Sequence, residues 1–347
     1  MYTNLNRKIL KYSVNSINVY VKTKGGIKMS QKIGLEVANG YIKVVSDDIE
    51  ISYPNRLKML TGEEFDVVGT LGSIYEFEGD QYIIDSTGTS SGGRNSNRYL
   101  TKEYLLEALV AISQVIKERN IVLTVGVPCR DFRKEQLKES IINNLKGRHE
   151  LKVIKGKTTE RFEINILEVF VVVEPMGTLC DYVFNNKFEI VDNRNQSKSL
   201  IIDIGYSTTD ILATDGLRIE KLHGADVGCM DIANQFLREI NSLDENVQFT
   251  LRDLGLDIKP IIKKFDLEFN FSEQLNKVKR NIVKSKLIPA IKESGLNPID
   301  FDVVLYTGGG ALAFENHMEL AFNEKVYVEP QLANARGFYK YTMIKKG

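Results

Sequence analysis

The sequence predicts an α/β protein that binds a phosphate-bearing ligand, and three short segments carry this prediction. The most informative is residues 200–212, LIIDIGYSTTDIL, where an apolar strand ends at one acid, Asp203. Gly205 then lets the backbone double back, so that its N–H groups and the hydroxyls of Ser207 and Thr208 can face an anion. This pattern is typical of a site for a phosphate and its metal ion.

The second segment repeats this design nearer the N-terminus. Residues 33–45, IGLEVANGYIKVV, consist of two alternating apolar arms around Asn39-Gly40. This dipeptide is a strong hairpin signal, because both residues tolerate positive φ. Glu36 precedes the turn and Lys43 follows it.

The third segment, residues 303–313, reads VVLYTGGGALA. It predicts a buried strand, three glycines and then a helix. Glycines at this place let the backbone approach a ligand closely, and the N-terminus of a helix favours an anion.

Together the three segments resemble the actin-like ATPase superfamily, which includes actin, the DnaK-type chaperones and the sugar kinases. Further blocks resemble the ParM group of plasmid-segregating proteins, and they are Asn39-Gly40-Tyr41-Ile42-Lys43, Tyr53-Pro54-Asn55-Arg56, Arg98-Tyr99, Val125-Gly126-Val127-Pro128, Glu174-Pro175-Met176-Gly177-Thr178-Leu179 and Asn334-Ala335-Arg336-Gly337-Phe338. The likeness runs from about Gln31 to about Lys340. It implies an actin-like ATPase fold, with two related lobes that each contribute one phosphate-binding hairpin to a shared nucleotide cleft.

On this interpretation residues 29–198 form the first lobe, completed by about 325–347, and residues 199–324 form the second. The polar run 192–198 favours this boundary, because it separates two apolar segments. Residues 1–28 carry six Lys or Arg and no acid, and they lack the apolar core of a signal peptide. They are expected to be a disordered leader or the product of a start upstream of Met29, with a basic arm that touches DNA, a membrane or another subunit left open.

Other patterns predict the elements between these segments. Amphipathic patterns predict helices from Thr101 to about Asn120 and at 131–145, 177–183, 230–240 and 272–291, the last with Pro289 as a kink or an end. Strands are expected at 49–53, 82–85, 121–127, 151–154 and 162–166, and a mobile Gly, Ser and Asn loop at 86–97.

Composition excludes several function classes. The chain has 347 residues, 43% of them hydrophobic, and 46 basic residues balance 46 acidic ones. Neither nucleic acid nor an anionic membrane is expected to bind such a chain directly. No apolar run is long enough to cross a bilayer, and Cys129, Cys180 and Cys229 are expected to be reduced core thiols of a cytoplasmic protein. A P-loop element is missing.

The resemblance assigns a role to each candidate residue. The nucleotide-binding candidates are Asn39, Gly40, Lys43, Gly205, Ser207, Thr208, Gly228, Asp231, Gly308, Gly309 and Gly310. Glu36 and Asp203 would hold Mg²⁺, mostly through its waters, because this ion dehydrates reluctantly. Glu174 and Asp203 are the catalytic candidates, with Glu174 positioning the attacking water. Their structural alternatives are a carboxylate that fixes the turn before Pro175 and, for Asp203, a turn cap.

The first hairpin departs from the family pattern at two positions. The resembled pattern has Asp where Glu36 stands and Gly where Ala38 stands. The carboxylate therefore reaches one methylene further, which leaves two alternatives open. Glu36 holds the metal through a water, or the role falls to Asp203 alone.

The resemblance implies an ATPase that polymerises into filaments with bound nucleotide, disassembles after hydrolysis and segregates plasmid DNA. It implies ATP as the nucleotide, with GTP left open, together with Mg²⁺. The implied partners are further copies of the chain and a ParR-like adaptor on centromere-like plasmid DNA. Two alternatives stay open, which are a small-molecule kinase of the same superfamily and a scaffold filament protein with little hydrolysis.

Overall fold

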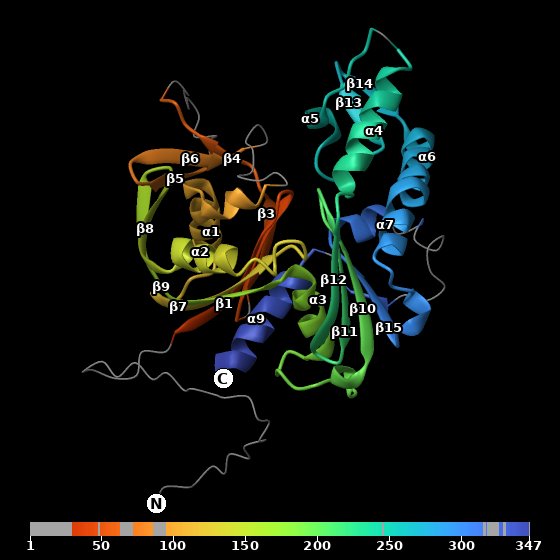
Figure 1. Ribbon diagram of the computed structural model, residues 1–347. Helices are drawn as coiled ribbons and strands as arrows, with labels where there is room; N and C mark the ends of the chain where they lie inside the picture. The colour runs from red at the N-terminus through yellow and green to blue at the C-terminus, as the bar shows by residue number, and fades with distance from the viewer. Residues whose placement is uncertain are drawn as a thin grey trace, which may run out of the picture.

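The computed structural model describes residues 30–47, 49–62, 72–85, 95–244, 246–314, 317, 326–328 and 331–346. The N-terminal extension expected at 1–28 and most of the loop expected at 86–97 lie outside these residues. Figure 1 shows two lobes side by side, each built on its own sheet.

The first sheet has nine strands in the order β3-β2-β1-β7-β9-β8-β5-β6-β4. They are β1 (Gln31–Val37), β2 (Tyr41–Ser46), β3 (Ile49–Pro54), β4 (Leu57–Met59), β5 (Ser73–Phe77), β6 (Asp80–Ile84), β7 (Asn120–Val127), β8 (Gly147–Lys155) and β9 (Thr158–Val173). The second sheet has five, in the order β12-β11-β10-β15-β16. They are β10 (Lys198–Ile204), β11 (Thr209–Asp215), β12 (Arg218–Ala225), β15 (Val303–Thr307) and β16 (Val326–Tyr327), and a separate hairpin pairs β13 (Ile261–Lys264) with β14 (Leu267–Asn270).

The two sheets repeat one topology. In the first, an antiparallel meander β1-β2-β3 is joined on the β1 side by the parallel strands β7 and β9. In the second, the meander β10-β11-β12 is joined on the β10 side by the parallel strands β15 and β16. The predicted hairpins are therefore the equivalent β1–β2 and β10–β11 units of the two lobes.

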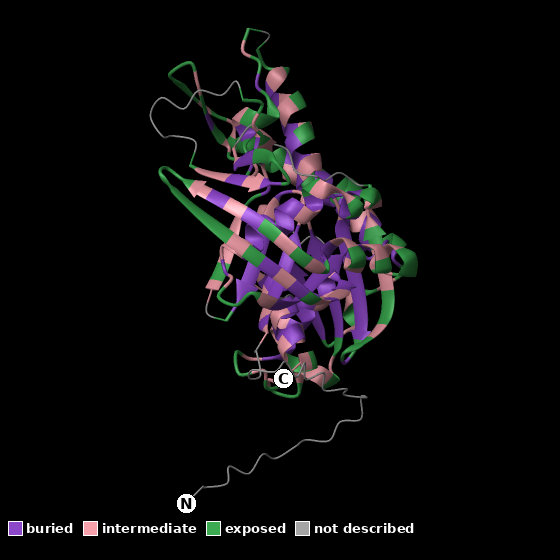
Figure 2. Cartoon of the chain, turned by 90° about the vertical axis from the view of Figure 1, so that its left-hand side faces the viewer, coloured by how far each residue is buried: buried purple, intermediate pink, exposed green. Residues whose placement is uncertain are grey.

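Helices cover both sheets (Figure 1). The helices are α1 (Lys102–Ser113), α2 (Glu135–Leu145), α3 (Glu174–Val183), α4 (Cys229–Asn241), α5 (Leu251–Leu254), α6 (Ser272–Ile282), α7 (Ile288–Glu293), α8 (Gly309–Phe314) and α9 (Ala333–Lys346). Figure 2 shows the buried residues gathered in the sheets and in the helix faces against them. The first core lies between the first sheet, α1 and α2, and the second between the second sheet, α4, α6 and α7. The predicted α/β class is confirmed.

Strand alternation directs the acids of both sheets toward two other helices. Because successive side chains point to opposite faces, the apolar neighbours of Glu36 on β1 pack into the core under α1. On the opposite face α9 lies so close that a Cβ at Gly34 would be 2.2 Å from Ala335 O. In the second sheet, Ile201 packs with α3 against the face opposite to α4. Asp203, two residues further on, shares that face.

Helices α3 and α9 pack directly against each other between the two sheets. Two glycines make this possible, since a Cβ at Gly337 would lie only 1.6 Å from Gly177 O. The apolar contacts of α3 are mainly with the second sheet, and α9 packs on the first. The division of the chain near residue 198 stays a prediction.

Several predicted helix limits were wrong. Helix α1 ends at Ser113 and not near Asn120, because the Gln31 side chain binds the backbone that follows: its Oε1 accepts from Lys117 N at 2.7 Å, and its Nε2 donates to Val115 O at 2.9 Å. Helix α2 begins at Glu135. The long helix 272–291 contains a π-helical turn at Val283–Leu287, before Pro289.

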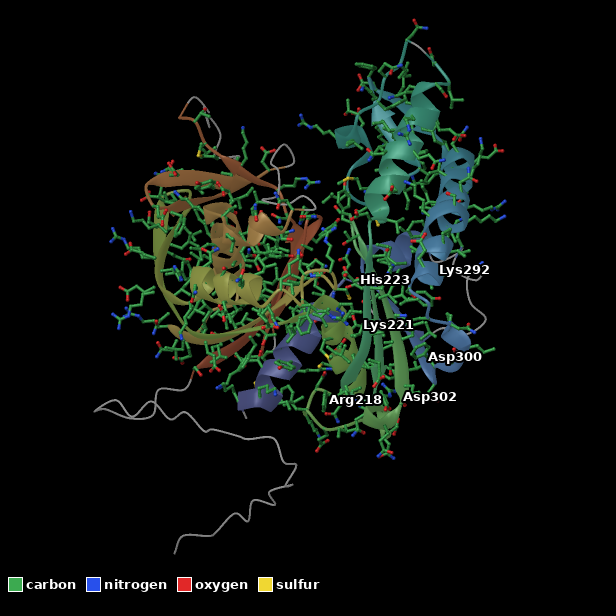
Figure 3. All side chains as sticks on the ribbon, viewed as in Figure 1. Arg218, Lys221, His223, Lys292, Asp300 and Asp302 are labelled. Carbon is green, nitrogen blue, oxygen red and sulfur yellow. The ribbon has the colours of Figure 1, made fainter. Side chains whose placement is uncertain are left out.

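The three cysteines are free thiols and buried, as predicted. Among the described residues, no helix is both long and apolar enough to cross a membrane. Strand β12 forms one edge of the second sheet, and Figure 3 shows Arg218, Lys221 and His223 along it. Charged side chains on an edge strand oppose pairing with another sheet.

Candidate active site

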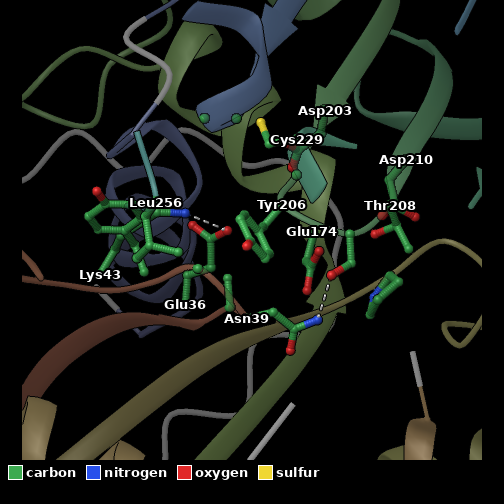
Figure 4. A pocket seen from close by; sticks show the side chains of 18 of the residues that line it. Glu36, Asn39, Lys43, Glu174, Asp203, Tyr206, Thr208, Asp210, Cys229 and Leu256 are labelled. Atoms are coloured by element: carbon green, nitrogen blue, oxygen red, sulfur yellow. Dashed lines mark hydrogen bonds and ion pairs between the residues drawn. The ribbon is translucent and has the colours of Figure 1, made fainter. Parts of the chain in front are cut away.

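A cleft of about 480 Å³ lies between the two lobes, which is the size of a typical small-molecule site. Its lining includes eleven of the predicted site residues, namely Glu36, Asn39, Gly40, Lys43, Glu174, Asp203, Gly205, Ser207, Thr208, Gly308 and Gly309. Figure 4 shows the side chains of both hairpins converging on it. Gly228, Asp231 and Gly310 do not belong to the lining.

The first hairpin places one acid opposite one base. Glu36 on β1 is the cross-strand partner of Lys43 on β2. Their side chains are both buried, and Lys43 Nζ lies 3.0 Å from Glu36 Oε1 (Figure 4). The Lys43 charge, predicted as a cation for phosphate, is therefore already opposed by a carboxylate of its own hairpin.

The second hairpin places two acids opposite each other. Asp203 on β10 is the cross-strand partner of Asp210 on β11, and both are buried. Burial, followed by the charge of Glu36, raises the pKa of Asp203 to about 7, although a hydrogen bond from Asn334 opposes this rise. Burial likewise raises the pKa of Asp210 to about 6, against a hydrogen bond from Cys129 N at 2.5 Å.

Asp210 was missed by the sequence analysis, although a signal for it exists. It follows Asp203 by seven residues, and Lys43 follows Glu36 by the same number. In a two-stranded unit with a conserved turn length, this spacing places the second residue opposite the first. Comparing the two hairpins position by position would have found it.

Asn334, near the start of α9, joins the acids of the two hairpins. Its Nδ2 donates to Asp203 Oδ2 at 2.6 Å and reaches Glu36 Oε1 at 3.5 Å. Its Oδ1 is held by Thr178, which donates from its N at 3.2 Å and from its Oγ1 at 2.8 Å. The amide orientation is thereby fixed by α3, and the NH₂ group faces the carboxylates.

Glu174 is the first residue of α3 and lines the cleft. Strand β9 ends at Val173, and Pro175 suits the first turn of a helix, where no backbone N–H partner is required. The pKa of Glu174 is raised well above its usual value by burial and then by the charges of Asp210, Glu36 and Asp203. Its carboxyl group therefore lies beside the acids of both hairpins.

The tips of the two hairpins contact each other. Asn39 Nδ2 donates to Ser207 Oγ at 3.3 Å, and a Cβ at Gly40 would lie 3.2 Å from Tyr206 Cβ. Arg98 donates to Asn39 Oδ1 and to Val37 O. A ligand that binds both turns would therefore contact the two lobes together.

The glycine turn after β15 lies against the second hairpin. Gly308 has φ of 82°, and a Cβ there would be 2.4 Å from Asp203 Oδ1. This is a conformation and a spacing that favour glycine. Gly310 packs on Ile204, where a Cβ would lie 2.2 Å from Ile204 Cγ2.

Gly228 and Asp231 form the N-terminus of α4 behind the second turn. Gly228 N donates to Asp231 Oδ2 at 3.0 Å, and Lys286 Nζ donates to Asp231 Oδ1 at 2.5 Å. Met230 N donates to Tyr206 O at 2.8 Å, so the helix end holds the turn in place. Their predicted direct contact with nucleotide stays a prediction.

Side chains of a different character also line the cleft. Its lining residues include Leu256, Ile258, Leu312 and Lys279. Burial lowers the pKa of Lys279. An apolar wall of this kind suits the flat ring of a base, and the polar hairpin tips suit phosphates.

The carboxylates at the hairpin end fit a hard cation. Oxygen donors from both lobes line the cleft there, and a divalent ion would offset their mutual repulsion. Within the described part of the chain, no three acidic, His or Cys side chains come together closely enough to hold a metal ion directly. Mg²⁺ keeps several of its waters, so it suits such a spread set of donors.

Comparison with known proteins gives a consistent picture. Residues 34–177 match the family described as the actin like proteins N terminal domain. An archaeal actin homolog shares 19% identity and a TM-score of 0.73, over 90% of this chain and 99% of that one. A 15-stranded ParM filament from Clostridium botulinum shares 17% identity and a TM-score of 0.73, over 91% and 99%.

The apo form of psk41 ParM shares 19% identity and a TM-score of 0.65, over 91% of this chain and 98% of that one. The archaeal homolog was also solved in complex with ADP, and that structure has a TM-score of 0.70 at 18% identity, over 90% of this chain and 99% of that one. At these identities the similarity shows a shared fold. No curated protein sequence is significantly similar to this one.

Proposed function

We propose that this chain, which shares the fold of ParM and matches the actin-like N-terminal family over residues 34–177, is an ATPase that assembles into filaments when nucleotide is bound. One observation carries this proposal. Two equivalent hairpins, one from each lobe, bring acids, amides and hydroxyls to a single cleft and contact each other at Asn39 and Ser207. A ligand with several phosphates fits a site formed by two such hairpins. We propose ATP as this ligand, and GTP is the alternative nucleotide to test.

Each group in the cleft then has a task. The backbone and hydroxyl donors of the turn at Gly205, Ser207 and Thr208 would bind phosphate oxygens. Mg²⁺, held through waters by Asp203 and Glu36, would supply positive charge to those oxygens. Glu174 would orient the water that attacks the terminal phosphorus, because it lines the cleft beside the acids of both hairpins.

Hydrolysis would weaken the closed arrangement of the lobes. While the terminal phosphate is present, contacts from Asn39 and Ser207 tie the first lobe to the second. The terminal phosphate thus stabilises the closed form more than the open form. When this phosphate leaves, that extra stabilisation is lost and the population shifts toward more open subunits. If subunits associate in the closed form, hydrolysis acts as a timer for filament disassembly.

The biological role proposed is the segregation of plasmid DNA in the cytoplasm. The net charge of zero argues against direct DNA binding, so a ParR-like adaptor on centromere-like DNA would connect filament and plasmid. Filament assembly is supported by the similarity in fold to a 15-stranded ParM filament.

A second candidate function rests on the first hairpin. The Glu36–Lys43 pair engages both the acid and the cation that would otherwise serve metal and phosphate. A filament protein that binds nucleotide and hydrolyses it little would tolerate this arrangement.

The test is light scattering of the full-length chain in Mg²⁺, with ATP, a non-hydrolysable ATP analogue or no nucleotide, alongside phosphate release. We expect scattering to rise with either triphosphate and to decay with ATP as phosphate appears. Persistent scattering without phosphate release would favour the scaffold. Nucleotide binding without scattering at any concentration would overturn the filament and favour a small-molecule kinase.

Glu174→Ala tests the timer directly. Phosphate release should fall by about 100-fold, the usual contribution of a positioned acid–base group, while scattering rises and then persists. Glu168→Ala is the matched control, because Glu168 lies on β9 and pairs with Lys346 at 2.7 Å, outside the lining of the cleft. Equal phosphate release by both variants would remove Glu174 from the mechanism.

A further inference from the structure

Arg98 is a buried cation at the phosphate end of the cleft. It lies in the 3₁₀ helix Ser96–Leu100, is 7% exposed and belongs to the lining of the cleft. Its guanidinium lies against two aromatic rings, 5.2 Å from the centroid of Tyr99 and 5.7 Å from that of Tyr104. The rings fix the plane of the guanidinium and exclude water from one side of it.

The charge of Arg98 has no carboxylate partner in the described part of the chain. Three Lys or Arg residues are buried there, and the other two form ion pairs: Lys43 with Glu36 at 3.0 Å and Lys340 with Asp181 at 2.7 Å. Among the residues that the structure describes, Arg98 donates to two neutral oxygens, Asn39 Oδ1 and Val37 O. Its Nε is buried and has no hydrogen-bond acceptor within the described ranges.

A buried cation of this kind is costly unless an anion binds it. Removing a charge from water is offset only by a close opposite charge with good hydrogen bonds, and hydrogen bonds to neutral oxygens offset part of the cost. In a cleft that binds an anionic ligand, the ligand can supply the missing charge. The planar guanidinium also suits two oxygens of one phosphate group.

The position of Arg98 selects one phosphate among several. Its charge opposes the rise in the pKa of Glu174, so the two groups lie at the same end of the cleft. Because Glu174 is proposed to orient the water that attacks the terminal phosphorus, a cation beside Glu174 lies near the terminal phosphate. Arg98 also bonds Asn39, which in turn bonds Ser207 of the other lobe.

We propose that Arg98 binds the terminal phosphate of a bound nucleoside triphosphate and makes the cleft discriminate between triphosphate and diphosphate. The inference rests on the proposed nucleotide-binding function and adds the residue that recognises the group lost in hydrolysis. Through Asn39, the same guanidinium connects that phosphate to the contact between the hairpin tips.

The experiment measures the affinities of the full-length chain for a fluorescent non-hydrolysable ATP analogue and for fluorescent ADP, both in Mg²⁺. Arg98→Gln should weaken binding of the triphosphate by about 10- to 100-fold, the range for a charge-assisted hydrogen-bonded contact. Binding of ADP should change by less than about threefold. Arg98→Lys keeps the positive charge but lacks the planar guanidinium. Its affinity for the triphosphate should lie between those of Arg98→Gln and the wild type.

Arg194→Gln is the matched control. Arg194 lies 4.3 Å from the centroid of the Tyr182 ring and donates to Tyr182 O at 2.9 Å, so it shares the stacking and the carbonyl bond of Arg98 but lies outside the lining of the cleft. Its triphosphate-to-diphosphate affinity ratio should equal that of the wild type. Retained ADP binding shows that each Arg98 variant is folded. If Arg98→Gln does not fold, the affinity ratio of Arg98→Lys decides the question.

Two results would overturn the inference, and they are distinguishable. If the wild type binds nucleotide and both Arg98 variants keep its affinity ratio, Arg98 does not recognise the terminal phosphate, while the proposed function stands. If the wild type binds neither nucleotide, the proposed function fails and this inference fails with it.

Discussion

The β1–β2 and β10–β11 hairpins share a backbone design and differ in charge. In each, an acid is followed seven residues later by its cross-strand partner. The turns are closed by equivalent hydrogen bonds, from Ala38 N to Tyr41 O at 3.2 Å and from Gly205 N to Thr208 O at 2.8 Å. The partner is a base in the first hairpin and a second acid in the second.

This difference shows which hairpin carries unfavourable charge repulsion. An opposite-charge pair directly across two strands stabilises a sheet, and a like-charge pair there destabilises it. The first hairpin is therefore self-sufficient, because Lys43 neutralises Glu36. The second depends on hydrogen bonds from other elements, from Asn334 to Asp203 and from Cys129 to Asp210. Its excess of negative charge suits a bound cation, which could in turn bind phosphate oxygens.

The largest effect should come from breaking the neutral pair. Lys43→Met leaves Glu36 buried without a counter-charge, so the free energy of unfolding should fall by about 3–5 kcal/mol. Urea denaturation measures it. The double variant Glu36→Gln with Lys43→Met should recover most of this loss, and additive losses from the two single variants would show that the pair is not coupled.

The second hairpin should respond in the opposite sense. Asp210→Asn removes one of two facing charges and keeps an oxygen for Cys129 N, so the free energy of unfolding should stay equal or rise by up to about 1 kcal/mol. Phosphate release should fall by about 100-fold, because the acid pair is expected to serve hydrolysis. Denaturation and phosphate assays on one preparation separate the two effects. A large loss of stability would contradict this account of the pair.

The smallest effect should come from making the first turn more like the second. Ala38→Gly places glycine where the second hairpin has Gly205, and it should lower the free energy of unfolding by about 0.5–1 kcal/mol through chain entropy. Gly205→Ala is the reciprocal variant. A Cβ there would lie 3.1 Å from Thr208 O, so it should weaken nucleotide binding more than Ala38→Gly does. Titration with labelled nucleotide compares them.

Local signals explain how much could be predicted. The turn at Asn39-Gly40, the acid and glycine after β10 and the glycines after β15 are properties of a few adjacent residues, and the structure has the expected strands at all three. The positive φ that was expected at Asn39 and Gly40 is found at neither residue. Predicted helix limits were less reliable, because they depend on residues distant in the sequence. The Gln31 side chain binds the backbone that follows α1, and Gln31 is 86 residues from its partner Lys117. Strands such as β4, β5 and β13 gave no strong pattern, since they are short or lie at exposed edges.

The sequence by itself determined the α/β class, the two hairpins and eleven of the residues that line the cleft, because these depend on short-range backbone preferences and strand alternation. Only the tertiary structure decided which charges meet. It paired Lys43 with Glu36, placed Asp210 opposite Asp203, brought Asn334 between the acids of two lobes and left Arg98 without a carboxylate among the described residues. The physical reason is that electrostatic interactions depend on distances in space, and strand register and helix packing set those distances.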